Sequence, residues 1–250
     1  MQTEQLGYAI DLRSGEKLTA TELAHRLATQ KRVLLGELHD SPRHHQAQHW
    51  LLKQFISKRP QGSLALEMLA VNQQPLIDRI YAKSAVKKSE IYDLLQWKKS
   101  WNWDFYGDIV YHAFNTPYSL VATNLTNDEV QTILRGAVPL KGYVSTTPEV
   151  KKQIADLIAN HHCADCIDVK YLQAMVEVQQ FRDRRMAEKI LQASTPALLI
   201  AGNHHVNRAF GVPLHLFDLS QQETATVVIV TDSVADFTQR NADYLWIIQE

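Results

Sequence analysis

Residues 33–40 read VLLGELHD, a short apolar run that ends in a glycine followed by acidic and imidazole side chains. Three other runs have the same form: SLAL before Glu67, SLVAT before Asn124, and ALLIAG before Asn203 and His205. Each run is rich in Val, Leu, Ile and Ala and is followed by a helix-like pattern, which is typical of buried parallel strands. The runs predict an α/β fold with a mostly parallel sheet flanked by helices.

The polar side chains that follow these runs are candidates for a shared site. In open parallel sheets, ligands bind outside the carboxyl ends of the strands, because the strand ends and the following loops converge there. We therefore expect one pocket to be lined by residues far apart in the sequence: Glu37, His39, Glu67, Asn124, Asn203 and His205.

Length and composition limit the fold and the partners. The 250 residues are expected to form a single α/β domain over 1–250, with helical additions at about 72–115 and 147–193 that interrupt the strand rhythm. Lys and Arg total 26 against 27 Asp and Glu, so no basic field favours a nucleic-acid partner.

No stretch approaches the roughly 20 apolar residues of a membrane helix, and residues 1–30 lack the apolar core of a secretory signal. We expect a chain that is soluble as given, with membrane contact only through a lipid anchor removed from it.

Cys163 and Cys166 are the only cysteines, in the segment HHCADC. They fit two ordinary thiols, a short-loop disulfide in an oxidising compartment, or a metal clip with His161 or His162. A lone C-x-x-C lacks the second ligand pair that identifies a structural zinc site.

Two helices are expected to carry site residues. The first starts at Ser41-Pro42 and runs to about Lys58, and its apolar stripe places His44, His45 and Gln48 on the buried side. The second, which ends near Gln192, has Gln179 and Asp183 at core positions. Asp183 is expected either to pair with a neighbouring arginine (Arg182, Arg184 or Arg185) or to belong to a site. A short strand is expected at 213–217.

The segments GELHD, PRHHQAQ, ALEM, WNWDFY, QFRDRRMA and AGNHHVNRAFGVP resemble the ChaN family of haem-binding uptake proteins, within the Tiki/TraB-like superfamily. They are spread from Val33 to Leu214. The resemblance implies a parallel sheet with a helical subdomain and a periplasm-facing lipoprotein, anchored to the outer membrane and active in haem or iron acquisition. It also implies a homodimer that holds haem at its interface through tyrosine ligation.

The same resemblance carries over these positions: Glu37, His39, Asp40, His45, Glu67, Trp103, Tyr106, Gln179, Asp183, Asn203 and His205. The sequence departs from the family pattern in two places. It has no lipid-attachment cysteine, which puts membrane anchoring in question, and His204 stands where a small residue is commoner.

Haem binding requires an axial ligand, an apolar slot and polar groups for the propionates. Tyr106 lies in the most aromatic segment, and a tyrosinate suits ferric haem, so Tyr106 is the expected iron ligand. Tyr111, Tyr143 and the histidine pairs compete for this role, and the aromatic segment also fits ordinary packing of helices on the sheet. The expected haem-binding residues are Tyr106, Trp103, His45, Gln179, Asp183 and Asn203.

A hydrolase is the alternative. GELH fits the G-x-x-H pattern of Tiki-like metalloproteases, so His39 and His205, with Glu37 or Glu67, could bind a divalent metal that activates water. A metal-free version uses His39 as general base, positioned by a carboxylate, as in the erythromycin esterases. A pure interaction module ranks last, because burying so many ionisable groups under a protein partner costs desolvation.

Overall fold

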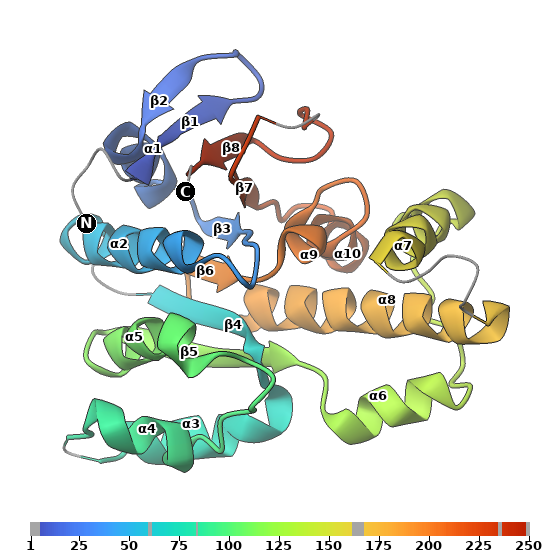
Figure 1. Cartoon of the computed structure of the whole chain (residues 1–250), viewed down its shortest axis with the longest axis horizontal. Coiled ribbons are helices and arrows are strands. Elements are labelled where there is room, and N and C mark those ends of the chain that lie inside the picture. The colour runs from blue at the N-terminus through green and yellow to red at the C-terminus, as the bar shows by residue number, and fades with distance from the viewer. Residues whose placement is uncertain (1–5, 60–61, 84, 162–167, 235–236, 249–250) are drawn as a thin grey trace.

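The computed structural model describes residues 6–59, 62–83, 85–161, 168–234 and 237–248, and the expectations for Cys163 and Cys166 fall outside them. Within these ranges one eight-stranded sheet has the order β2-β1-β8-β7-β3-β6-β4-β5. The six strands from β8 to β5 run parallel, and β1 is antiparallel to both of its neighbours. The predicted mostly parallel α/β fold is therefore confirmed (Figure 1). The strands are β1 (Tyr8–Asp11), β2 (Lys17–Thr19), β3 (Arg32–Leu35), β4 (Gly62–Ala70), β5 (Tyr118–Asn124), β6 (Ala197–Ile200), β7 (Thr226–Thr231) and β8 (Tyr244–Ile247).

The central strands are mostly apolar because helices cover both faces of the sheet. Every residue of β3, β4 and β6 is buried. Successive side chains of a strand point to opposite faces, so Leu198 and Ile200 of β6 join one core while Leu199 joins the other. A continuous apolar run is therefore what these strand positions require.

One face of the sheet packs against α1 (Ala20–Ala28), α2 (Pro42–Lys58) and α5 (Trp103–Phe114). The other packs against α8 (Val169–Gln192), α9 (Asn203–Val206) and α10 (Val212–Leu219). Figure 1 shows α8 as a long helix along the sheet, with the remaining helices outside these layers. Those are α3 (Gln74–Tyr81), α4 (Lys88–Leu94), α6 (Asn127–Leu134), α7 (Pro148–His161) and the 3-10 turn η2 (Val71–Gln73). In the described part of the chain, no helix is long and apolar enough to cross a membrane.

Helix α2 confirms the expected bounds and the expected buried side. It begins at Pro42 and ends at Lys58, and His44, His45 and Gln48 are buried with its apolar stripe. Ser41 precedes the helix, and its hydroxyl bonds no amide of the first turn.

The strand expected at 213–217 is wrong, because these residues lie in α10. Pro213 is in the first turn of that helix, where its fixed φ is tolerated. Val212, His215 and Leu216 are its buried residues, which is the three- and four-residue spacing of a helix face.

Candidate functional site

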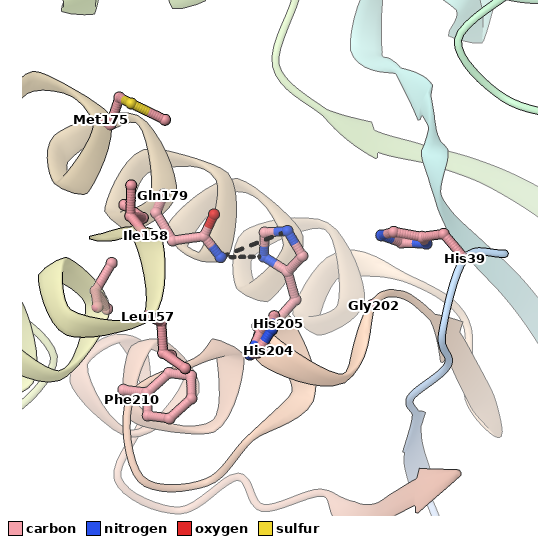
Figure 2. Close-up of a pocket in the computed structure, with 10 residues that line it drawn as sticks. His39, Leu157, Ile158, Met175, Gln179, Gly202, His204, His205 and Phe210 are labelled. Carbon is pink, nitrogen blue, oxygen red and sulfur yellow. Dashed lines mark hydrogen bonds between the residues drawn. The ribbon is translucent and has the colours of Figure 1, made fainter. Parts of the chain in front are cut away.

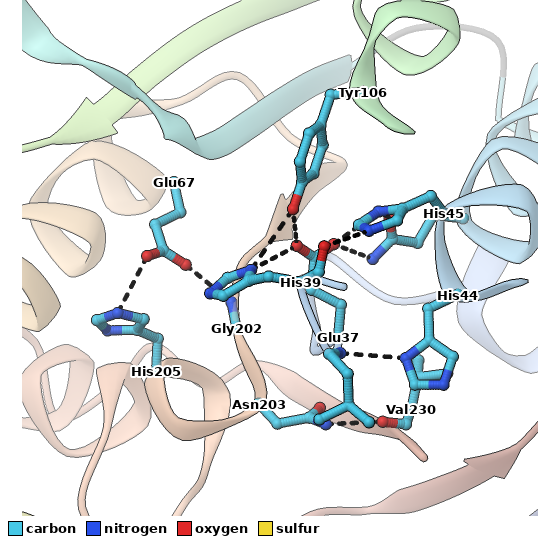
Figure 3. A network of polar contacts seen from close by, with 12 residues as sticks. Glu37, His39, His44, His45, Glu67, Tyr106, Gly202, Asn203, His205 and Val230 are labelled. Carbon is cyan, nitrogen blue, oxygen red and sulfur yellow. Dashed lines mark hydrogen bonds and ion pairs between the residues drawn. The ribbon is translucent and has the colours of Figure 1, made fainter. Parts of the chain in front are cut away.

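Three adjacent parallel strands bring the predicted acids and imidazoles to one edge of the sheet. Strand β6 pairs with both β3 and β4, so the residues after all three strands leave the sheet side by side. Glu37 and His39 follow β3, Glu67 lies in the last part of β4, and His205 lies in α9 directly after β6. Figure 3 shows these four side chains converging.

One half of the network is centred on Glu37, which is buried. His39 Nδ1 lies 2.8 Å from Glu37 Oε1, and the Tyr106 hydroxyl donates to the same oxygen. The other oxygen accepts a bond of 2.6 Å from Gln48 Nε2, and His45 Nδ1 lies 3.4 Å from it. Four side chains from the segment after β3, α2 and α5 thus hold one carboxylate in place.

The other half is centred on His205. Its Nε2 lies 3.2 Å from Glu67 Oε1, and its Nδ1 lies 2.5 Å from Asp183 Oδ1 and 2.9 Å from Gln179 Nε2. Glu67 is fixed in turn by the Gly202 amide, which donates to Oε2 at 2.8 Å. The partner of Asp183 is therefore His205, and the expected arginine pairing is wrong. Two of those arginines pair elsewhere: Arg184 with Asp218 and Arg185 with Glu129.

Mutual ion pairing keeps these buried groups charged. Burial alone would raise the pKa of Glu37, but hydrogen bonds with His39 and His45 overcome it and lower the pKa to about 2. Burial likewise opposes protonation of His39 and His45, yet the hydrogen bond with Glu37 raises the pKa of both above its usual value. At neutral pH Glu37 is consequently an anion between imidazoles that favour the protonated form.

His205 shows the strongest effect of this kind. Burial lowers its affinity for a proton, but the charges of Glu67 and Asp183 raise its pKa to about 10. Burial raises the pKa of Asp183 to about 6 despite His205, whereas His205 holds the pKa of Glu67 well below its usual range against the effect of burial. His205 is therefore an imidazolium at neutral pH, and both of its ring nitrogens are engaged.

The two predicted asparagines support the site rather than line it. Asn203 donates from Nδ2 to Val230 O at 2.7 Å, and its own amide donates to Glu37 O at 2.9 Å. Asn124 donates to Glu67 O at 2.9 Å. Trp103 packs against Tyr92 and Trp97.

Asp40 and His44 also lie apart from the network. Asp40 is exposed. His44 is buried and bonds the Leu38 amide at 3.1 Å and Asp232 Oδ1 at 2.9 Å.

Tyr106 lies in the interior of this network. Its side chain is 1 % exposed and its hydroxyl donates to Glu37. Burial and the negative charge of Glu37 raise the pKa of Tyr106 far above its usual value. An axial ligand needs an accessible phenol that readily loses its proton, so this placement argues against Tyr106 as the haem ligand.

A cavity of about 210 Å³ opens beside the network (Figure 2). His39, Gln179 and His205 form its polar end. Its apolar wall comes from α7, α8 and the loop after α9, with Ile154, Leu157, Ile158, Met175 and Phe210. Pockets that enclose drug-sized ligands measure about 300–1,000 Å³, so this cavity is too small to enclose a macrocycle.

The metal alternative has no support from the geometry. Among the described residues, no group of three or more His, Cys, Asp or Glu side chains has the arrangement to hold a metal ion. His39 and His205, the expected ligands, instead each bond a carboxylate through a ring nitrogen.

A second region, which the strand-tip argument missed, lies on the surface at the loop before α7. Tyr143 is 79 % exposed there. The next residue, Val144, lines an open hollow of about 570 Å³ together with apolar side chains of α10 and with Arg208. The sequence indicated this region only weakly: Tyr143 was one of the tyrosines that could replace Tyr106 as the iron ligand, and it follows Gly136, Pro139 and Gly142 in a loop. We call Tyr143 and this hollow the Tyr143 face.

Asp218 of α10 holds the loop that carries Tyr143. Its carboxylate accepts bonds from Val144 N at 2.7 Å and Ser145 Oγ at 2.6 Å, and it pairs with Arg184 Nη2 at 3.2 Å. A methyl group at Gly142 would lie 2.1 Å from Asp218 Oδ2, so the loop closes over this carboxylate only with glycine there. These contacts hold the loop that carries the exposed Tyr143 in one position.

Comparison with known proteins identifies related folds and a family. The chain is similar to ChaN of Campylobacter jejuni, a structure described as showing cofacial haem binding, with 33 % identity over 98 % of this chain and 97 % of that one and a TM-score of 0.90. An erythromycin esterase in its open conformation (13 % identity, 90 % of this chain and 76 % of that one, TM-score 0.51) shares the fold alone. The type III effector HopBA1 also shares the fold alone, with 10 % identity over 92 % of this chain and 93 % of that one and a TM-score of 0.51.

A search of curated proteins gave no match. The model of the family described as haem-binding uptake, Tiki superfamily, ChaN matches residues 23–216. This chain therefore belongs to the ChaN family of haem-binding uptake proteins.

Proposed function

We propose that this protein binds ferric haem at the Tyr143 face and serves haem or iron uptake. The observation that carries the site is an exposed tyrosine on a fixed loop beside an open apolar hollow. The strand-tip cavity lacks the volume, and Tyr106 lacks the access, that an iron-bound macrocycle requires.

Tyr143 supplies what a ferric haem needs from its axial ligand. A phenolate is a hard anionic oxygen and stabilises Fe(III). Tyr143 is open to solvent, so an iron centre can reach its hydroxyl, whereas the hydroxyl of Tyr106 is buried against Glu37. Bound haem would contribute the iron centre itself, while the chain contributes the ligand oxygen and its position.

The hollow next to Tyr143 fits the edge of a haem. Val144, Pro213, Leu214 and Phe217 give it an apolar lining, as a porphyrin face requires. Arg208 lies at the same hollow, paired with Asp243, and offers a cation for a propionate. The hollow thus offers apolar contacts to the porphyrin and one arginine to a propionate, and the carboxylates of Glu223 and Asp243 line it as well.

A haem on an exposed face remains open on its far side, and we propose that a second copy of the chain covers it. The Campylobacter jejuni protein is described as binding haem cofacially, which is consistent with two haems stacked between two chains. Exposed apolar side chains near this loop, including Val138, Tyr143 and Phe217, would be buried in such a dimer. Action in the periplasm as a lipid-anchored protein belongs to the same proposal and is supported by the family alone.

Titration with hemin tests the proposal. We expect one haem per chain, a high-spin ferric spectrum with a tyrosinate charge-transfer band, and a rise from monomer to dimer in sedimentation as haem is added. Tyr143→Phe should remove the charge-transfer band, whereas Tyr111→Phe, a matched change of a half-buried tyrosine, should not. A Tyr143→Phe protein with the wild-type spectrum contradicts the ligand assignment.

Metal-free ester hydrolysis is a second candidate, favoured by one contact. His39 Nδ1 lies 2.8 Å from a carboxylate that is itself held by three other side chains, which is how a general base is oriented. Hydrolysis of a small chromogenic ester, lost in His39→Ala and kept in Tyr143→Phe, would support it. A wild-type rate equal to that of His39→Ala would remove it.

A further inference from the structure

The cavity beside the strand-tip network is separate from the Tyr143 face and has two chemically different ends. Figure 2 shows Leu157, Ile158, Met175 and Phe210 on one side and His39 on the other, with Gln179 and His205 between them. Its volume of about 210 Å³ equals about seven waters at roughly 30 Å³ each, enough for a short aliphatic chain. The cavity therefore suits a small amphiphile.

The polar end of this cavity presents imidazole groups and the Gln179 amide to a ligand. Glu37, Glu67 and Asp183 are buried behind the imidazoles, and none of the three lines the cavity. His39 is 42 % exposed and its Nδ1 is held at Glu37, so its second ring nitrogen is the one available to a ligand. Against the effect of burial, the paired carboxylate raises the pKa of His39, which favours the form in which this nitrogen donates. His205 adds a fixed positive charge. A ligand head at this end must accept hydrogen bonds, and an anionic head does so most strongly.

The opposite end has the character of an aliphatic chain site. Ile154, Leu157 and Ile158 come from one face of α7 and Met175 comes from α8, so the tail would lie between two helices. Methionine and branched aliphatic side chains match an alkyl chain, and burying each CH₂ of the tail favours binding.

We propose that this cavity is a second ligand site that takes a short aliphatic monocarboxylate, with its head at His39 and its tail between α7 and α8. The network behind the cavity then has a role that haem binding does not explain. It holds His39 and His205 in place and fixes their charge at the mouth of the site. The proposal stands apart from the haem proposal because the two use different residues.

Octanoate labelled with ¹³C at its carboxyl carbon is a suitable probe, followed by NMR and calorimetry on the haem-free chain. We expect saturable binding with one octanoate per chain. Loss of a charge-assisted hydrogen bond costs about 1.5–3 kcal/mol, so 1-octanol, which has the same tail without the charge, should bind about tenfold or more weakly. Octylamine should bind more weakly still.

Two variants locate the site. His39→Gln removes the cation and should weaken octanoate binding by about tenfold or more while affecting octanol little. Met175→Trp fills the tail region without touching the polar network and should weaken both probes, with a melting temperature near that of the wild type. Tyr143→Phe is the control and should bind octanoate as the wild type does.

Three outcomes overturn the proposal: no saturable binding, equal affinity for octanoate and octanol, or binding unchanged in both His39→Gln and Met175→Trp. Displacement of octanoate by one equivalent of hemin would also overturn it, because the cavity would then belong to the haem site. Loss of hemin binding in Tyr143→Phe with octanoate binding retained is the result expected if both sites exist.

Discussion

The strand-tip network and the Tyr143 face both concentrate chemically active side chains, but they are built in opposite ways. In the network, buried carboxylates pair with imidazoles, and Tyr106 serves as a hydrogen-bond donor. At the Tyr143 face, an exposed tyrosine and apolar side chains stand on a loop held by one buried carboxylate. A tyrosine's chemistry is therefore set by its surroundings: one phenol stabilises an internal anion, and the other is free to meet a ligand.

Removing the cation at the centre of the network gives the largest expected effect. His205→Leu leaves Glu67 and Asp183 buried without the charge that both of them face. Breaking a buried pair in this way costs about 3–5 kcal/mol of unfolding free energy. Lys152→Ala, which removes an exposed pair with Asp156, should leave the unfolding free energy almost unchanged. Urea denaturation measures the unfolding free energy of both variants. A loss in His205→Leu no larger than that in Lys152→Ala would mean that the network contributes little to stability.

The sheet and the network were predictable from sequence because both depend on patterns along the strands. Each of the four apolar runs overlaps one of the strands β3, β4, β5 and β6, and their parallel order brings Glu37, His39, Glu67 and His205 together. Asp183 was recognisable as a polar group at a core position of α8. Its partner was not, because sequence spacing cannot reveal a contact between α8 and α9.

The Tyr143 face left a weaker signal because loops have no periodicity. Tyr143 lies between Gly142 and Val144 with nothing in its neighbourhood to separate it from other surface residues. The WNWDFY segment attracted the ligand assignment because aromatic density is visible in sequence, whereas exposure is not. Residues 213–217 were misassigned for a related reason, since five residues are too few to distinguish a strand from a helix face.

Loosening the support of Tyr143 should have an intermediate effect. Asp218→Asn keeps the shape of the side chain but removes its negative charge. That charge pairs with Arg184 and accepts hydrogen bonds from Val144 and Ser145. Hydrogen bonds to charged groups contribute about 1.5–3 kcal/mol, so haem should dissociate about tenfold faster or more. Asp156→Asn, on the exposed side of α7, is the control. Identical haem dissociation rates in the two variants would show that the loop needs no such support.

The pH dependence of stability, counted per pH unit, is the smallest effect and concerns the network alone. The folded-state pKa of His205 is raised to about 10 from 6.5, so its stabilisation is complete below about pH 6.5 and is lost as the pH rises through about 10. The unfolding free energy should therefore fall above neutral pH, by at most about 1.4 kcal/mol per pH unit from this group. Denaturation at pH 7 and pH 9 should show a steeper fall for the wild type than for His205→Gln. If the unfolding free energy falls equally with pH in the wild type and in His205→Gln, His205 is not a buried imidazolium.

A paired measurement on the two tyrosines tests most directly whether haem binds at the Tyr143 face and not at the network. The spectrum of the ferric haem complex and the unfolding free energy are recorded for Tyr106→Phe and Tyr143→Phe. We predict that Tyr106→Phe loses about 1–3 kcal/mol, because Glu37 loses a buried donor, and keeps the tyrosinate spectrum. Tyr143→Phe should keep its stability and lose that spectrum. The reverse pattern, with the spectrum lost only in Tyr106→Phe, would contradict the assignment.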